Sequence, residues 1–115
     1  MALAVVMGAF GAHALKNRLD AYSMTVYEKA VFYHFVHALG ILLVSLLART
    51  NAISVVGQTR AAWFLLIGIV VFSGSLYALA LSGVRILGAI TPIGGVAFII
   101  GWLVLAYEAI RAQQS

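Results

Sequence analysis

Charged residues divide the chain into four apolar stretches, over residues 2–15, 26–48, 61–81 and 86–110. An α-helix rises about 1.5 Å per residue, so about 20 apolar residues are needed to cross the hydrocarbon core of a bilayer. The last three stretches meet this length. The pattern therefore predicts a single all-α domain over residues 1–115, an integral membrane four-helix bundle.

The first stretch is shorter than the others. A helix over residues 2–15 would be only about 21 Å long, which is less than the thickness of the hydrocarbon core. We therefore expect either a short first helix or further apolar residues ahead of Met1. A cleaved signal peptide is disfavoured, because no basic residues precede the apolar run.

Residues 16–29 have the pattern of a short amphipathic helix that lies in the membrane interface between the first and second spans. Apolar side chains recur at helical spacing with charged side chains between them, namely Leu15, Leu19, Tyr22 and Val26 with Lys16, Arg18 and Asp20. Thr25 and Glu28 match a capping box, which predicts that the second long helix begins at about Val26.

The fourth stretch contains Thr91-Pro92, for which two interpretations remain open. Thr91 can be an N-cap with Pro92 in the first helical turn, so that residues 85–90 form an irregular lead-in. Alternatively, one longer helix is kinked at Pro92.

Composition supports the membrane assignment. Of 115 residues, 64% are hydrophobic and 9% are charged, whereas soluble domains carry about 25% charged residues. The net charge of +4 suits contact with anionic lipid headgroups and forms no basic stripe for nucleic acid. The chain has no cysteine, which excludes disulfides, thiol nucleophiles and cysteine-ligated metals.

Small residues recur inside the expected helices. In lipid, such residues let helices approach closely. They can pack the helices of this chain together, or they can form a surface for another membrane protein or a second copy. The positions expected to pack helices are Gly8, Ala12, Gly74, Gly94, Gly95, Ala97 and Gly101.

Three histidines lie toward one end of the expected bundle. His34 and His37 share one side of their helix, and His13 lies near the end of the first stretch. With Tyr77 and Thr91 as hydrogen-bond partners, they can simply lock helices together. Alternatively they bind a cofactor, either a metal or haem iron through imidazole or a quinone headgroup. We predict no cofactor and leave haem, metal and quinone open.

Features of catalysis are sparse. Asp20, Glu28 and Glu108 are the only carboxylates, and Glu108 is expected at the opposite face of the membrane from the other two. No pair is therefore available for acid–base chemistry. Neither a nucleophile elbow nor a phosphate-binding loop is present. We expect a protein that is not an enzyme.

Several separated blocks occur in the same order as in one known family. They are GAFGAHALK over residues 8–16, Tyr33-His34 with His37 to Gly40, Phe72 to Tyr77, and Thr91 to Gly95 with Gly101-Trp102. The chain resembles the domain of unknown function 423 family, the YgdD-like bacterial membrane proteins related to animal transmembrane protein 256. The resemblance implies a four-helix protein of the bacterial inner membrane and supplies no activity, cofactor or catalytic residue.

Together these features predict a small accessory or scaffolding subunit that packs in the lipid bilayer against a larger membrane complex or against itself. The alternative is a cofactor-binding membrane protein that uses His13, His34 and His37.

Overall fold

The computed structural model describes all of residues 1–115 and is entirely helical. Three helices are long and apolar enough to cross a membrane. They are α2 (Ala21–Arg49), the continuous helix α3 (Val55–Gly68), η2 (Ile69–Ser73) and α4 (Gly74–Ser82), and α5 (Thr91–Gln114) with its lead-in η3 (Arg85–Ala89). A fourth and shorter apolar helix, α1 (Ala2–Phe10) with η1 (Gly11–Leu15), precedes them.

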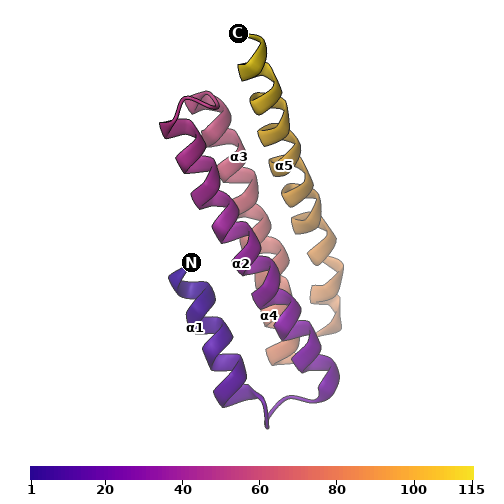
Figure 1. Ribbon diagram of the computed structural model, residues 1–115. Helices are drawn as coiled ribbons and strands as arrows, with labels where there is room; N and C mark the ends of the chain where they lie inside the picture. Colours follow the sequence, from indigo (N-terminus) through magenta and orange to yellow (C-terminus); the bar gives the residue numbers. More distant parts are fainter.

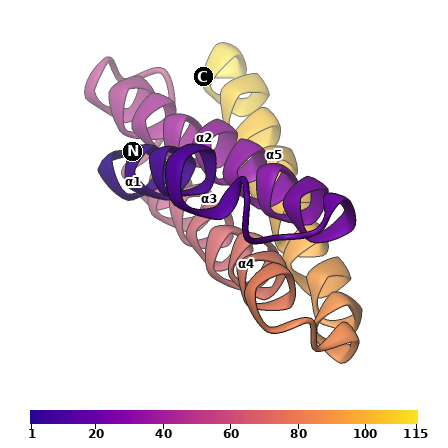
Figure 2. The ribbon, with the colours of Figure 1, turned by 90° about the horizontal axis from the view of Figure 1, so that it is seen from below.

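Successive long helices run antiparallel, and the central α3–α4 helix packs against both neighbours (Figure 1). α1 packs against α2 and covers only the half of it that is nearer the N-terminal end of α2 (Figures 1 and 2). The molecule measures 54 × 26 × 15 Å. The long axis exceeds the thickness of the hydrocarbon core, about 30 Å, so both ends of the long helices reach the polar layers.

The expected interfacial helix is not present as a separate element, and that prediction is wrong. Residues 16–20 form a turn, and α2 already begins at Ala21. The carboxylate of Asp20 accepts a hydrogen bond from the N–H of Ser23 at 2.7 Å, whereas the Thr25 hydroxyl donates to the carbonyl of Ala21. Asp20 is the effective cap because an anionic oxygen also interacts favourably with the positive end of the helix dipole.

This cap makes the start of α2 sensitive to acid. The N–H of Ser23 holds the pKa of Asp20 below its ordinary value of 3.8. Because the folded chain binds this proton less readily than the unfolded chain, the stabilisation is complete above the unfolded pKa and is lost as the pH falls through the lower folded pKa. A carboxyl-carbon NMR titration should show the lowered pKa. In Asp20→Asn, which still caps with an oxygen, this pH dependence should vanish. A folded pKa at or above the ordinary value would contradict the assignment.

The other two long helices also begin differently from the expected spans. α3 begins at Val55 and not at residue 61, because the Ser54 hydroxyl accepts the N–H of Gly57 at 2.9 Å as an N-cap. α5 begins at Thr91 with Pro92 in its first turn, and residues 85–89 form a 3-10 helix. The structure therefore confirms the lead-in and excludes one long kinked helix, but Thr91 is not the N-cap: it is already the first helical residue, and Ile90 stands at the cap position.

The core lies between the three long helices, and much of its packing involves small residues. Its main cluster contains Val44, Ala61, Leu65, Phe98 and Leu105. Near the middle of the central helix, the π-helical segment η2 brings the backbone of Phe72 directly against Gly94 of α5. The hydroxyl of Ser73, which is fully buried, donates to the carbonyl of Ala30 at 2.9 Å and ties this segment to α2.

Candidate functional site

Polar side chains in the first half of α2 join helices to one another through hydrogen bonds. Nδ1 of His34 lies 3.1 Å from the Tyr77 hydroxyl, so α2 and α4 share a hydrogen bond. The rings of Tyr77 and Tyr27 are in contact at 5.2 Å, and the Tyr27 hydroxyl donates to the carbonyl of Met7 in α1 at 2.6 Å. His34 therefore belongs to a network that fastens three helices.

Tyr77→Phe tests the worth of this link. Removing the hydroxyl leaves Nδ1 of His34 without its partner, and we expect a loss of about 0.5–1.5 kcal/mol in the free energy of unfolding. Tyr107→Phe is the matched control, because Tyr107 is exposed and forms no hydrogen bond through its side chain. Both values can be measured by SDS titration in mild detergent, followed by circular dichroism. Equal effects of the two variants would contradict a structural role of the His34–Tyr77 hydrogen bond.

Thr91 does not contact a histidine. Its hydroxyl shares a hydrogen bond of 2.7 Å with the hydroxyl of Ser75 and thereby links the start of α5 to α4. The expected pairing of Thr91 with the histidines is therefore wrong. The reason is that η3, just before Thr91, packs against α4 and so places the Thr91 hydroxyl beside Ser75.

His37 occupies a different place from His34. Its Nδ1 lies 2.7 Å from the backbone carbonyl of Tyr33, one turn earlier in α2. Its ring stacks on Phe98 of α5 with 3.4 Å between ring centroids, and it lies 5.9 Å from the ring of Trp102. The hydrogen bond and the stack fix the orientation of the ring from two directions.

His13 is separate from both. It is exposed on η1 and forms no side-chain hydrogen bond or aromatic contact. The structure contains no group of three His, Cys, Asp or Glu side chains that could hold a metal ion. The three histidines therefore do not converge on one centre. The 3.6-residue period that places His34 and His37 on neighbouring sides of α2 still separates them, one toward α4 and one toward α5.

Sequence reasoning missed a buried hydrogen bond between α5 and the start of α3, at the other end of the molecule. Glu108 is only 7% exposed, and one of its carboxylate oxygens accepts a hydrogen bond from Ser54 at 2.8 Å. The carboxylate lies directly against Gly57, in the first turn of α3. The sequence signal was Ser54 as an N-cap, but nothing in the sequence pairs residue 54 with residue 108.

At most of the expected small residues, the space beside the residue is occupied by other atoms of the same chain. Gly94 lies against Phe72, Gly101 against Leu65, and Ala97 is buried. On the other side, Gly8 packs near Val31, while Gly11 of η1, which was not among the predicted packing positions, lies directly against the ring of Tyr27 in α2. Ala12 is exposed at the edge of a shallow pocket between the two helices.

Two of the expected packing positions have more open space around them than the others. A side chain at Gly95 would meet only the ring of Phe72 at ordinary contact distance, 3.7 Å. Gly74 has open space where a Cβ would lie, with nothing within 4 Å. Gly74, like the exposed Ala12, is therefore a predicted packing residue that the chain leaves uncovered.

The sequence matches one known family. The family described as "Protein of unknown function (DUF423)" matches residues 7–95. A UPF0382 membrane protein of Staphylococcus epidermidis is 54% identical over 109 residues, which are 95% of this chain and 87% of that protein. The UPF0382 membrane protein YwdK of Bacillus subtilis is 47% identical over 110 residues, with 95% and 88% covered. No solved structure matches the chain.

Proposed function

We propose, for a chain that belongs to the DUF423 family of bacterial membrane proteins, a non-enzymatic role as an accessory or scaffolding subunit. In this role it packs in the bilayer against the helices of a larger membrane protein or of a second copy. The single observation that carries the proposal is the uncovered small-residue surface on α4.

This surface consists of Gly74 and Ala78, one turn apart on the same side of α4. Gly74 has nothing within 4 Å of the position of a Cβ, and Ala78 is exposed. Two small residues at this spacing let the backbone of another helix approach closely, which is the main source of helix association in lipid. The buried glycines of the long helices already lie against other atoms of this chain, so they are not free for this purpose.

The test is native mass spectrometry of the protein released from lipid nanodiscs formed directly from its own membrane. We expect a complex that contains either a second copy or another membrane protein. Gly74→Leu and Ala78→Leu should dissociate it without unfolding the chain, because the added atoms enter open space. Ala106→Leu is the matched control, since Ala106 is exposed on α5. A monomer without partners in the native membrane would refute the proposal.

We also propose that α1 lies within the same bilayer as the fourth member of the bundle. Its residues are apolar, and it packs on α2 through Gly8 and Gly11. Because the chain has no cysteine, a single Leu3→Cys variant can be labelled cleanly. A water-soluble maleimide should fail to label Leu3→Cys and should label Ser115→Cys. Rapid labelling of both positions would place α1 outside the membrane.

Cofactor binding by the histidines is the second candidate function. The separation of His13 from His34 and His37 gives no support to a metal or haem site built from all three. One observation favours a different kind of ligand, because His37 has a ring nitrogen without a partner. Absorption spectra of the purified protein, with extraction of bound organic molecules, discriminate haem from a lipid-soluble ligand.

A further inference from the structure

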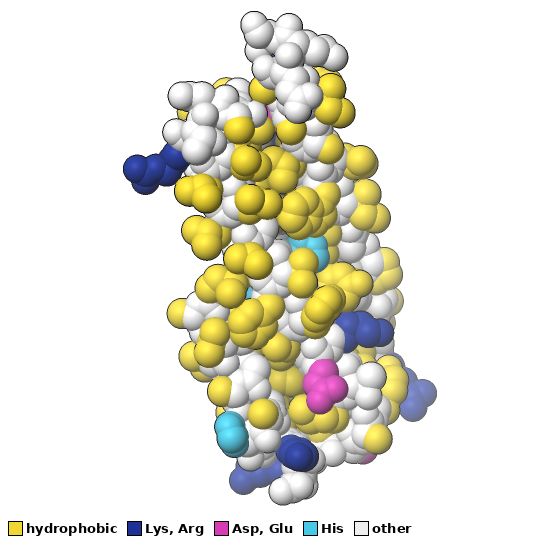
Figure 3. Space-filling view, viewed as in Figure 1, with side chains coloured by type: hydrophobic (Ala, Val, Ile, Leu, Met, Phe, Trp, Pro, Cys, Tyr) yellow, Lys and Arg dark blue, Asp and Glu magenta, His cyan; other side chains and the backbone are white.

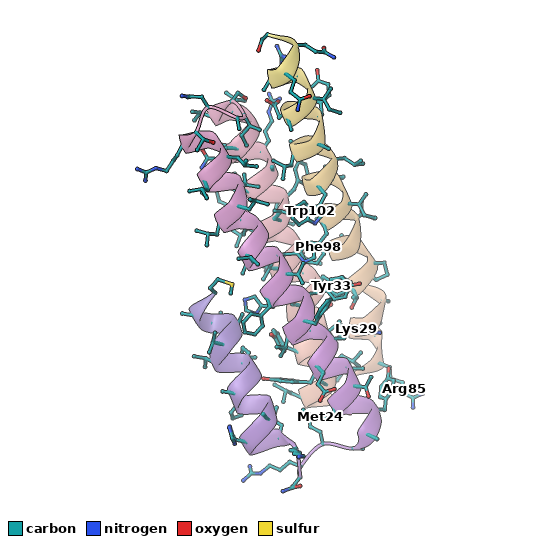
Figure 4. The ribbon with its side chains drawn as sticks, in the orientation of Figure 1. Met24, Lys29, Tyr33, Arg85, Phe98 and Trp102 are labelled. Atoms are coloured by element: carbon teal, nitrogen blue, oxygen red, sulfur yellow. The ribbon has the colours of Figure 1, made fainter.

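The seam between α2 and α5 contains polar atoms without partners at the middle of the membrane. Tyr33, Phe98 and Trp102 lie along this seam (Figure 4). His37 is the seventeenth of the 29 residues of α2 and is therefore near the centre of the span. It is 5% exposed, yet its Nε2 forms no hydrogen bond. No buried side-chain nitrogen or oxygen lacks a partner in this protein, so Nε2 must reach the surface.

The hydrogen bond on the other side of the ring decides what Nε2 can do. Nδ1 lies 2.7 Å from the carbonyl oxygen of Tyr33, and a carbonyl oxygen can only accept. Nδ1 therefore carries the proton. In the neutral imidazole Nε2 then holds the lone pair and is an acceptor. An acceptor that faces hydrocarbon without a donor is unfavourable, which argues for an occupant with an N–H or O–H group.

Tyr33 supplies the complementary group. Its ring lies nearly parallel to that of His37, with 5.8 Å between centroids and 8° between planes. Its hydroxyl has no hydrogen-bond partner and, by the same reasoning as for Nε2, is accessible. A donor and an acceptor thus lie one turn apart in the same seam. A hydroxyl group satisfies both, since it can accept from Tyr33 and donate to His37.

An apolar groove of about 490 Å³ lies further along α2, and Trp102, whose ring centroid is 5.9 Å from that of His37, is part of its lining. Gly40 allows the ring of Trp102 to approach α2 at the edge of this groove. The groove is lined by Val36, Leu39, Gly40, Leu42, Leu43, Leu46 and Trp102. α1 does not cover this half of α2 (Figure 1). In the space-filling view of this face, a histidine ring (cyan) is seen at mid-height among hydrophobic side chains (Figure 3).

We infer that this seam binds a membrane-soluble hydroquinone that carries an apolar tail. One hydroxyl of the ligand accepts a hydrogen bond from Tyr33 and donates one to Nε2 of His37. The aromatic ring contacts the edges of the aromatic side chains in the seam, and the tail lies in the groove along α2. The inference is independent of the packing role proposed above, which uses the surface of α4.

The oxidised form of the same ligand provides the sharpest test. A quinone has carbonyl oxygens, which can accept from Tyr33 but cannot donate to His37. A short-tailed alkyl hydroquinone and the matching alkyl quinone would be titrated, without oxygen, into the full chain in lipid nanodiscs with ¹⁵N-labelled histidine. We expect Nδ1 of His37 to carry the proton in the free protein. The hydroquinone should shift the Nε2 signal saturably and bind about tenfold more tightly than the quinone, the value of one hydrogen bond.

Substitutions separate specific binding from partition into lipid. Tyr33→Phe keeps the aromatic stack and removes the donor, and it should weaken hydroquinone binding about tenfold. Tyr22→Phe is the matched control, because Tyr22 is exposed near the start of α2 and should bind the ligand as the unmodified chain does. Circular dichroism would verify the fold of both.

Three outcomes overturn the inference. In the first, the NMR signals of His37 show that Nε2 and not Nδ1 carries the proton. The same conclusion holds if the Nε2 signal does not shift when hydroquinone is added, because only water or the hydroxyl of a second copy then occupies the seam. In the second, the two forms of the ligand bind equally. In the third, binding is the same in Tyr33→Phe and Tyr22→Phe, which would show partition into lipid alone.

Discussion

Gly94→Ala is expected to lower the free energy of unfolding by about 3 kcal/mol, because one added methyl group would overlap a backbone that cannot move aside. A Cβ at this position would meet the backbone nitrogen and Cα of Phe72. Phe72 belongs to η2, which is itself held against α2 by the hydrogen bond from Ser73 to the carbonyl of Ala30. Relief of the clash therefore requires α5 to separate from the central helix.

The neighbouring glycine, Gly95, provides a control variant at the adjacent position. A Cβ at Gly95 would lie 3.7 Å from the ring of Phe72, an ordinary contact. Gly95→Ala should therefore be neutral or stabilise the protein by up to about 1 kcal/mol, since alanine restricts the unfolded chain. Unfolding by SDS in mild detergent measures both variants. If the two alanines have the same effect, the close approach of α5 and η2 is not present in the membrane.

The effect of Gly57→Ala on the free energy of unfolding should change sign when Glu108 is also replaced by alanine. Alone, it should cost about 2 kcal/mol, because the new methyl group would displace the buried carboxylate of Glu108 and break its hydrogen bond with Ser54. Glu108→Ala alone should cost about 1–2 kcal/mol, since it removes a hydrogen bond and an anion at the positive end of α3. In Glu108→Ala, however, the space beside Gly57 is free, and the same alanine should stabilise α3 by about 0.5–1 kcal/mol.

The double-mutant cycle therefore predicts a coupling free energy of more than about 2 kcal/mol. The control cycle combines Gly57→Ala with Glu28→Ala, which removes an exposed carboxylate at the other end of α2, and its two effects should simply add. Additive effects in the cycle with Glu108 would mean that Glu108 does not lie against α3 in the membrane.

The helices themselves were predictable from the sequence, but their ends were not. The apolar stretches located all three long helices because lipid requires their length. Their first residues depended on caps: Thr25 was expected to cap the second helix, which Asp20 caps, and the third helix was expected from residue 61, although Ser54 caps it before Val55. A capping box is a local pattern that several sites can satisfy, and the choice among them depends on which side chain meets the first free N–H groups. At Pro92 the local rule was sufficient, because proline fits the first turn of a helix wherever the rest of the chain lies.

The candidate site was predictable only as a set of residues. Helical spacing placed His34 and His37 on neighbouring sides of α2, and the antiparallel order of helices brought Tyr77 to the depth of His34. The sequence could not show that the two histidines face different helices, nor that Nδ1 of His37 turns back to its own helix. These details depend on how α5 and α4 pack on α2. The pairing of Ser54 with Glu108 was inaccessible for the same reason.

The π-helical segment η2 gives the central helix two different surfaces. A π-helical segment inside an α-helix is equivalent to one inserted residue, and an inserted residue rotates everything that follows by about 100°. Before this segment, α3 packs on both α2 and α5; after it, α4 packs on α2 and on the lead-in η3. Removal of one residue from Ile69–Ser73 would leave the central helix nearly as long but would turn Gly74 and Ala78 to a different side of it. Segment η2 thus sets which side of the protein is presented to its neighbours in the membrane.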